Sequence, residues 1–175
     1  GHNFRPDYLK LPDYRKAYDI PQVLLLTATA TKRVTGDMCS KFGLSDNCVM
    51  TTGFHRSNLV LEVEDVKQEE KDQRLLEWLL PKCSPQRESP VSAIVYVTLQ
   101  KTADRIAKLC CEHGMNAAAY HAGMENERRI EVQTAFMNNA IHCVVATIAF
   151  GMGIDKPDIR YIIHYDIPKS IEGYS

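Results

Sequence analysis

Short apolar runs alternate with amphipathic segments along most of this chain. Runs of small and β-branched apolar residues predict strands at Ala93–Val97, Ala117–Tyr120, His142–Thr147 and Tyr161–Tyr165. Between them, apolar residues that recur every three or four positions predict helices at Thr102–His113 and Glu125–Asn138. This alternation is typical of βαβ units, so it predicts an α/β fold with a mainly parallel sheet. Right-handed crossovers then bring every strand-end loop to one edge of that sheet.

The earlier part of the chain predicts more elements of the same kinds. The apolar run Val23–Thr27 suits a buried strand, and Thr31 is placed to cap a helix at Lys32–Phe42 that Gly43 ends. The alternation in Leu59–Val66 predicts a strand with one wetter face.

An amphipathic helix is predicted next at Glu69–Leu80, followed by a proline-punctuated surface loop at Pro81–Pro90. The polar segment 45–58 is the best candidate for a domain boundary. The chain lacks a starting methionine and stops at 172–175 without a helix cap or turn, so we expect a piece of a longer protein.

Composition narrows the class of protein. The 175 residues are 45% hydrophobic and 25% charged, as in globular proteins, and the net charge of −1 gives no global attraction to nucleic acid or membrane. Polyanion binding therefore has to come from local donors. Six cysteines without Cys-x-x-Cys spacing predict thiols in a reducing compartment, and the absence of a leader or long apolar run supports neither secretion nor membrane spanning.

The richest chemistry follows the predicted strand at His142–Thr147. There the chain runs through Thr147, Gly151, Gly153 and Asp155. Ligands of α/β sheets bind just beyond the carboxyl ends of the strands, where glycines allow close approach to a phosphate and a carboxylate accepts hydrogen bonds. Short glycine loops also occur in ordinary turns, and a flavodoxin-like or dinucleotide-binding domain is one alternative. That alternative lacks a Gly-x-Gly-x-x-Gly motif after the first strand.

Five segments in order resemble one family. They are Leu26-Thr-Ala-Thr-Ala-Thr31, Ile94-Val-Tyr-Val97, Ala119-Tyr-His-Ala-Gly-Met124, Val145-Ala-Thr-Ile-Ala-Phe-Gly-Met-Gly-Ile-Asp-Lys-Pro157 and the stretch from Ile162 to Glu172. Together they resemble the RecQ family of superfamily 2 DNA helicases, over nearly the whole chain.

The resemblance implies a RecA-like parallel sheet flanked by helices, of the P-loop NTPase type. Residues 1–53 would be the C-terminal part of a first RecA-like domain, and 54–175 a second one, truncated at its end. The parent would be an ATP-dependent helicase that moves 3′ to 5′ on single-stranded or partly duplex DNA, in DNA repair, recombination or replication. We then expect an intracellular protein, in the cytoplasm or nucleoid of a bacterium or the nucleus of a eukaryote.

The resemblance also implies roles for individual residues. Facing the nucleotide are Gly151, Gly153 and Asp155. Contacting DNA are Phe4, Arg5, Thr98, Gln100, Thr102, His121, Gly123 and Thr147. Coupling the two sites are Thr27, Ala28 and Thr29.

Quieter interpretations stay open for several of these residues. Thr27 and Thr29 suit a strand end and a helix cap, and His121 is more often a structural turn residue than a catalytic one. Gly151, Gly153 and Asp155 also suit an ordinary turn.

The chain departs from the family pattern in several places. Ser57 replaces the family's proline after Arg56, and Val97 replaces its cysteine. No Gly-x-x-x-x-Gly-Lys-Ser/Thr phosphate loop and no Asp-Glu-x-His magnesium motif is present. ATP and Mg²⁺ would therefore bind in the full-length parent, with no complete catalytic or metal site here, no tight binding and no ATP hydrolysis by these residues alone. A non-catalytic nucleic-acid-binding or interaction module with a helicase-like fold is the alternative.

Overall fold

The computed structural model describes residues 6–27, 31–51, 57–86, 88, 91–148, 150–151 and 154–167. The chain divides into two compact units, one up to residue 61 and the other from residue 62. This division lies a few residues after the 53–54 boundary that the sequence suggests. Each unit is described by itself.

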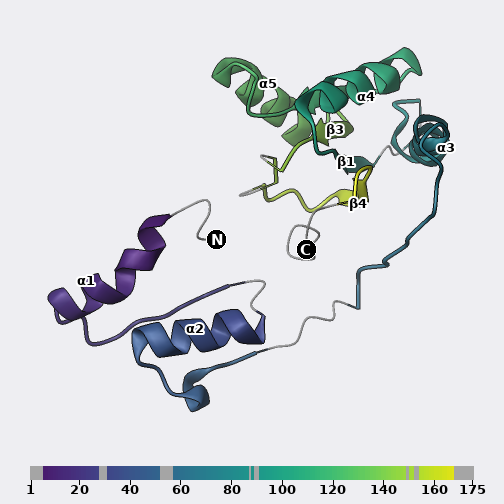
Figure 1. The fold of residues 1–175 in the computed structure, drawn as a ribbon. Coiled ribbons are helices and arrows are strands. Elements are labelled where there is room, and N and C mark those ends of the chain that lie inside the picture. The colour runs from purple at the N-terminus through teal and green to yellow at the C-terminus, as the bar shows by residue number, and fades with distance from the viewer. Residues whose placement is uncertain are drawn as a thin grey trace. The chain divides into compact units, whose positions relative to one another are not determined.

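A four-stranded sheet forms the centre of the second unit. Its strands are β1 (Ser92–Tyr96), β2 (Ala117–Tyr120), β3 (Cys143–Ala146) and β4 (Ile159–His164). All pairs are parallel and the strand order is β2-β3-β1-β4 (Figure 1). The predicted α/β fold with a parallel sheet is thus confirmed, and the four strands predicted from residue 93 onward are each found within two residues of their expected bounds.

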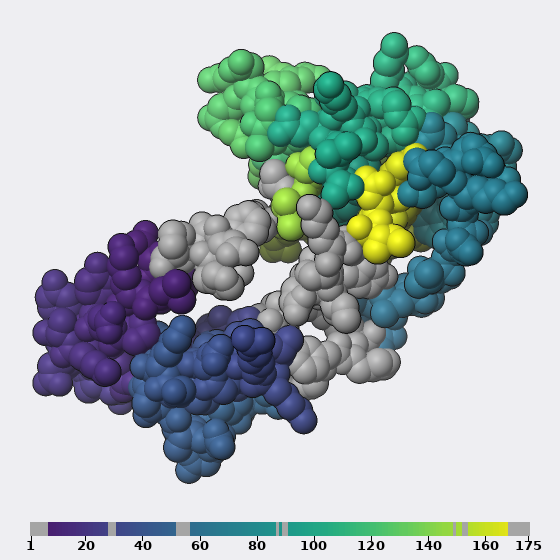
Figure 2. All heavy atoms as spheres, viewed as in Figure 1, coloured from purple at the N-terminus to yellow at the C-terminus, as the bar shows by residue number. Residues whose placement is uncertain are grey.

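Helices pack on both faces of this sheet. The core on one face joins α3 (Lys71–Cys83) and α4 (Gln100–Glu112) to alternate residues of β1 and β3, among them Val95 and Val145. On the other face, Val132 and Phe136 of α5 (Asn126–Met137) pack with Ile94 and Val144. Apolar side chains that point both ways explain why these strands read as continuous hydrophobic runs rather than alternating ones. The outer surfaces of α4 and α5 are visible as teal and green atoms in Figure 2.

One helix boundary differs from the sequence prediction. The helix predicted at Glu69–Leu80 runs instead to Cys83, so Pro81 lies inside it rather than opening a loop. Pro81 lacks an N–H, so it removes one backbone hydrogen bond of the helix. Because Pro81 lies in the last turn, the helix ends only two residues after it. Leu79 and Cys83 are fully buried on either side of it, and their packing favours the extra turn.

The described part of the first unit begins with a short 3₁₀ helix and two α-helices: η1 (Pro6–Lys10), α1 (Leu11–Ala17) and α2 (Lys32–Phe42). The α2 prediction is confirmed with its caps. The Thr31 hydroxyl accepts the backbone N–H of Val34 at 3.3 Å, and Gly43 ends the helix at a φ of 63°. Sequence reasoning missed α1, and a second 3₁₀ helix, η2 (Asp46–Cys48), lies in the polar segment.

Two predicted strands are wrong. Residues 23–27 and 59–66 are neither strand nor helix, and most of their apolar side chains face solvent: Leu24 is 80% exposed and Val63 is 98% exposed. A strand needs a hydrogen-bonded neighbour and a face to bury. Among the described residues, the sheet contains only the four strands β1, β2, β3 and β4. These two segments therefore have no hydrogen-bonded neighbouring strand and no sheet face to bury.

All six cysteines carry free thiols. Within the described ranges, no helix combines the length and the apolar character needed to cross a membrane.

Candidate functional site

The carboxyl ends of the parallel strands form the edge at which the sequence predicts binding residues. The ladder continues past the strands there, with Thr147 N donating to Tyr120 O at 3.2 Å and Val97 N donating to Ala146 O at 2.9 Å. Each strand is followed by a polar residue close to its carboxyl end. Because of the strand order, these residues form one row: His121, Thr147, Thr98 and Asp166.

Thr98 is held by a carboxylate that sequence reasoning did not select. Its backbone N–H and its hydroxyl both donate to Oδ2 of Asp166, at 2.8 and 2.7 Å. The Lys71 ammonium lies 3.9 Å from Oδ1 of the same carboxylate. Since a phosphate oxygen is also only an acceptor, the Thr98 hydroxyl can donate to DNA only by releasing Asp166. The only feature of the sequence that could have indicated Asp166 is its position, because it follows β4 as Thr98 follows β1.

Three other predicted residues meet at the carboxyl edge. A Cβ on Gly123 would collide with the side-chain oxygen of Gln100 and would lie 3.3 Å from Nδ1 of His121. A side chain at position 123 would therefore force the Gln100 side chain to move, because the loop after β2 comes close to the start of α4. This contact joins Gln100, His121 and Gly123 into one cluster at the carboxyl edge.

His121 is 6% exposed, and its ring has two different nitrogens. Nε2 lies 3.1 Å from Oδ1 of Asp104, an acceptor, so Nε2 carries a hydrogen. Nδ1 is buried and has no hydrogen-bond partner in the described part of the chain. In the neutral ring Nδ1 only accepts, so His121 can donate to a phosphate there only when protonated. The geometry thus suits His121 to fixing the turn at Gly123.

The N-terminus of α4 offers further donors at this edge. Leu99 is the N-cap residue and provides no side-chain capping bond, so the first backbone N–H groups of α4 lack a side-chain partner. Gln100 is exposed and Thr102 is half-buried in this turn. Unpaired N–H groups at a helix N-terminus attract phosphate.

The loop after β3 does not stay at the carboxyl edge. It starts at Thr147, whose carbonyl accepts Phe150 N at 3.1 Å, and it ends beside Ile159, which pairs with the first residue of β1, Ser92. The loop therefore leads from the carboxyl ends of the parallel strands to their amino ends. Asp155, an exposed residue, lies only four residues before Ile159. Thr147 and Asp155 belong to opposite ends of this loop.

Gly151 has a packing reason to be glycine. Its φ is 113°, and a Cβ there would stand 2.5 Å from the Tyr96 hydroxyl, which donates to the Phe150 carbonyl at 3.0 Å. Tyr96 also stacks on His164, with ring centroids 5.5 Å apart. Burial raises the pKa of Tyr96 and lowers that of His164.

A buried lysine anchors the far end of the loop, and sequence reasoning missed it. The Lys156 side chain is 3% exposed, and its ammonium donates to Asn139 Oδ1 at 2.6 Å and to Asp158 Oδ2 at 2.7 Å. Hydrogen bonding from Lys156 lowers the pKa of Asp158, and burial, reinforced by the Lys156 charge, lowers the pKa of His142 nearby. Burial of a cation is costly unless its charge is paired and hydrogen-bonded, and these two partners meet that condition for Lys156.

The remaining predicted residues are less informative. Thr27 is exposed in the first unit. Outside the described residues lie Phe4, Arg5, Ala28, Thr29 and Gly153.

A metal site is not assembled in the described part of the chain, where no three His, Cys, Asp or Glu side chains could together hold an ion.

Known proteins resemble this chain along its whole length. Residues 70–175 match the family described as helicase conserved C-terminal domain. Over 99% of its length the chain is 39% identical to the ATP-dependent DNA helicase RecQ of Bacillus subtilis (strain 168) and to the RecQ-like DNA helicase BLM of Xenopus laevis. It is 37% identical over 99% to the ATP-dependent DNA helicase Q1 of Mus musculus. The chain spans 28%, 12% and 26% of the lengths of these three relatives.

Proposed function

Because the chain belongs to the helicase conserved C-terminal domain family and is of the RecQ type, we propose that it supplies the second motor domain of an ATP-dependent DNA helicase. The full protein would hydrolyse ATP and move 3′ to 5′ along single-stranded DNA, in DNA repair or recombination. Residues up to 53 would belong to the preceding RecA-like domain, and 54–175 to this one.

The row of polar groups at the carboxyl edge is the observation that best supports DNA binding. Thr98, Gln100 and Thr147 offer hydroxyl and amide donors there, and the N–H groups that open α4 add more. Such donors contact the sugar–phosphate backbone without reading bases, as a motor that moves along any sequence requires. In this proposal a phosphate takes the place of Asp166 on Thr98.

The nucleotide would be reached from the other end of the loop. The exposed carboxylate of Asp155 can accept hydrogen bonds from ribose hydroxyls, and Lys156, buried beside it, fixes where it stands. The phosphate-binding loop and the Mg²⁺ carboxylate would come from outside these residues. Mg²⁺ would neutralise charge on the transferred phosphoryl group.

A loop that joins both sites provides a path for coupling. Movement of Asp155 with the nucleotide would shift the chain that leads back to Thr147, and the reverse would hold for DNA. Thr27, Ala28 and Thr29 would act in the same sense in the first domain. DNA as substrate, together with six free thiols, favours an intracellular site of action, in a nucleus or a nucleoid.

Replacement of Asp155 by alanine in the full-length protein tests the nucleotide assignment. We expect ATP turnover in the presence of single-stranded DNA to fall by about tenfold or more, because a hydrogen bond to a charged group contributes about 1.5–3 kcal/mol. Steady-state ATPase assays across ATP concentrations measure the effect. The matched control is Glu127→Gln, a charge-removing change at an exposed position of α5.

The outcomes separate the hypotheses. Unchanged turnover in Asp155→Ala would show that this residue does not face the nucleotide. A full-length protein that binds single-stranded DNA but never hydrolyses ATP would support the non-catalytic module instead.

A further inference from the structure

Strand β2 forms one edge of the sheet, and its sequence leaves that edge unprotected. It pairs with β3 only, and it consists of Ala117, Ala118, Ala119 and Tyr120. Edge strands commonly carry a proline or a charged residue that prevents another strand from pairing. This strand carries neither.

The hydrogen bonds to β3 reveal which backbone groups point outward. Carbonyls of Asn116 and Tyr120 accept from β3 and the residue that follows it, at 3.2 Å each from Cys143 N and Thr147 N. In a parallel strand alternate residues address opposite neighbours, so Ala117 and Ala119 direct their N–H and C=O groups away from β3.

The ends of this free edge are closed, but its middle is open. The Cys111 thiol donates to the Ala117 carbonyl at 3.2 Å, and the His121 N–H donates to the Met124 sulfur at 3.4 Å. Ala119 makes no outward hydrogen bond within the part of the chain that the structure describes.

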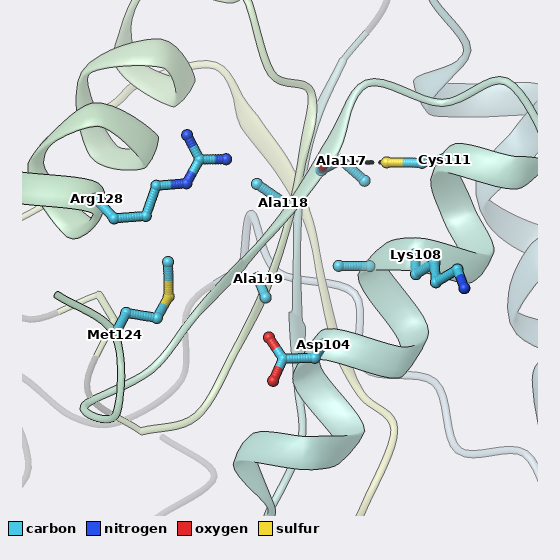
Figure 3. A pocket seen from close by; sticks show the side chains of 9 residues that line it. Asp104, Lys108, Cys111, Ala117, Ala118, Ala119, Met124 and Arg128 are labelled. Carbon is cyan, nitrogen blue, oxygen red and sulfur yellow. Dashed lines mark hydrogen bonds between the residues drawn. The ribbon is translucent and has the colours of Figure 1, made fainter.

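A groove of about 260 Å³ lies along this edge. The three alanines form its floor, with α4 on one side and the loop and helix that contain Met124 and Arg128 on the other (Figure 3). This volume is below the range of 300–1,000 Å³ typical of sites for small ligands. It suits short side chains that alternate along an added strand.

Two cations flank the groove from opposite sides. Lys108 projects from α4 and Arg128 from α5, and Figure 3 draws them on either side of β2. Their present partners are exposed neighbours on their own helices, Glu112 at 3.8 Å and Glu131 at 2.9 Å. Exposed pairs of this kind contribute little, so both cations are free to exchange them for a ligand. The groove's one carboxylate, Asp104, is engaged by His121.

We propose that the β2 edge binds an extended, acidic segment of a partner protein as an additional strand. Main-chain hydrogen bonds to Ala119 would provide affinity, as in other cases of strand addition. Successive side chains of a strand point to opposite faces. Two neighbouring acidic residues among small apolar ones would therefore reach Lys108 and Arg128 at once. This surface is separate from the carboxyl edge.

A labelled peptide tests the proposal with the 175-residue chain. The probe is fluorescein-Val-Ala-Val-Ala-Glu-Glu-Ala-Val-Ala-Val, and anisotropy measures its binding. We expect saturable binding that weakens about tenfold or more when Gln-Gln replaces Glu-Glu, and that is lost when alternate peptide nitrogens are methylated to remove donors. Equal binding of the methylated peptide, or no binding of the probe, would overturn strand addition.

Variants of the chain give an independent check. Ala119→Pro removes an N–H that points away from β3, so the sheet keeps its own bonds while the added strand loses one. We expect at least tenfold weaker binding for Ala119→Pro, and severalfold weaker binding for Lys108→Glu and Arg128→Glu, which change exposed side chains only. Arg160→Glu, exposed on β4 at the other edge, is the matched control and should bind like the unmodified chain.

Three results would contradict the assignment. They are full binding by Ala119→Pro shown to be folded by circular dichroism, full binding by both charge reversals, or equal loss in Arg160→Glu. Sedimentation that shows dimers abolished by Ala119→Pro would identify a second copy, rather than an acidic partner, as the occupant.

Discussion

At Gly151 the backbone has a φ of 113°, and the hydroxyl of Tyr96 lies 2.5 Å from where a Cβ would stand. Side chains rarely tolerate that φ, so two separate causes make this position a glycine. The contact links the loop after β3 to the central strand β1. Part of the glycine pattern of this loop therefore reflects packing, independently of any nucleotide.

A double-mutant cycle on Gly151 and Tyr96 tests this explanation. We expect Gly151→Ala to lower the free energy of unfolding by about 2 kcal/mol, from backbone strain and contact with the hydroxyl. In a Tyr96→Phe background the same change should cost about 1 kcal/mol less, since the hydroxyl is gone. Urea unfolding followed by fluorescence of Trp78, the single tryptophan, measures the second unit. An equal cost in both backgrounds would show that Tyr96 is not the cause.

Contacts between residues that are far apart along the chain could not be predicted from the sequence. His121 and Thr98 were selected because they follow strands, and the structure brings both to one edge. Their partners Asp104 and Asp166 lie 17 and 68 residues away along the chain, with nothing local to indicate the pairing. Lys156 was invisible for the same reason, because a lysine before a proline suggests an exposed turn rather than a buried cation.

At the scale of elements, one polar network ties α3, α4 and the end of β4 together. Arg105 of α4 pairs with Asp72 of α3, and the Tyr165 hydroxyl donates to the same carboxylate at 2.7 Å. Hydrogen bonding from Arg105 holds the pKa of Asp72 below its usual value. The pair fixes α3 beside the strand that delivers Asp166 to the carboxyl edge.

This network predicts a component of acid sensitivity. A carboxyl with a lowered pKa in the folded state adds stability that is fully present above its unfolded pKa, about 3.9. That stability is lost as pH falls through the folded pKa. We therefore expect Asp72→Asn to cost about 1 kcal/mol at pH 7, because the pair is partly exposed, and progressively less as the pH falls below the unfolded pKa. Urea midpoints of Trp78 fluorescence between pH 2 and 7 measure the difference.

Glu127→Gln provides the control for this series, since the described contacts show no ion pair for Glu127. At pH 7 its urea midpoint should lie close to that of the unmodified chain. A constant gap between Asp72→Asn and the unmodified chain down to pH 2 would mean that the network does not titrate as described.

Most elements of the second unit were predictable, and those of the first unit were less so. The runs of the central strands β1 and β3 are apolar on both faces because helices cover both, so sequence and structure agree. The runs at 23–27 and 59–66 look similar in the sequence, yet they lack a pairing partner in the described ranges. Strand formation depends on that partner, which local sequence does not contain.

At the scale of the whole molecule, the second unit separates its proposed functions by position on one sheet. Its carboxyl edge carries the proposed DNA contacts, the loop after β3 leads from there toward Asp155, and the side edge at β2 is left for a protein partner. The parallel order of the strands, which the sequence pattern predicted, is what collects the first group. The passage of the loop to the opposite edge follows from where β4 begins, and no local pattern indicates it.

The most direct test of the DNA assignment is the single-stranded DNA concentration that gives half-maximal ATPase activity in the full-length protein. We compare the unmodified protein with Thr98→Val/Thr147→Val, and use Thr134→Val on the exposed face of α5 as the control. We expect the double variant to need about tenfold more DNA, from two lost hydrogen bonds of about 0.7 kcal/mol each, with an unchanged salt dependence because hydroxyls displace no counterions. The control should not change. An unaltered DNA requirement in the double variant, with its fold intact by Trp78 fluorescence, would contradict the claim that this edge of the sheet binds DNA.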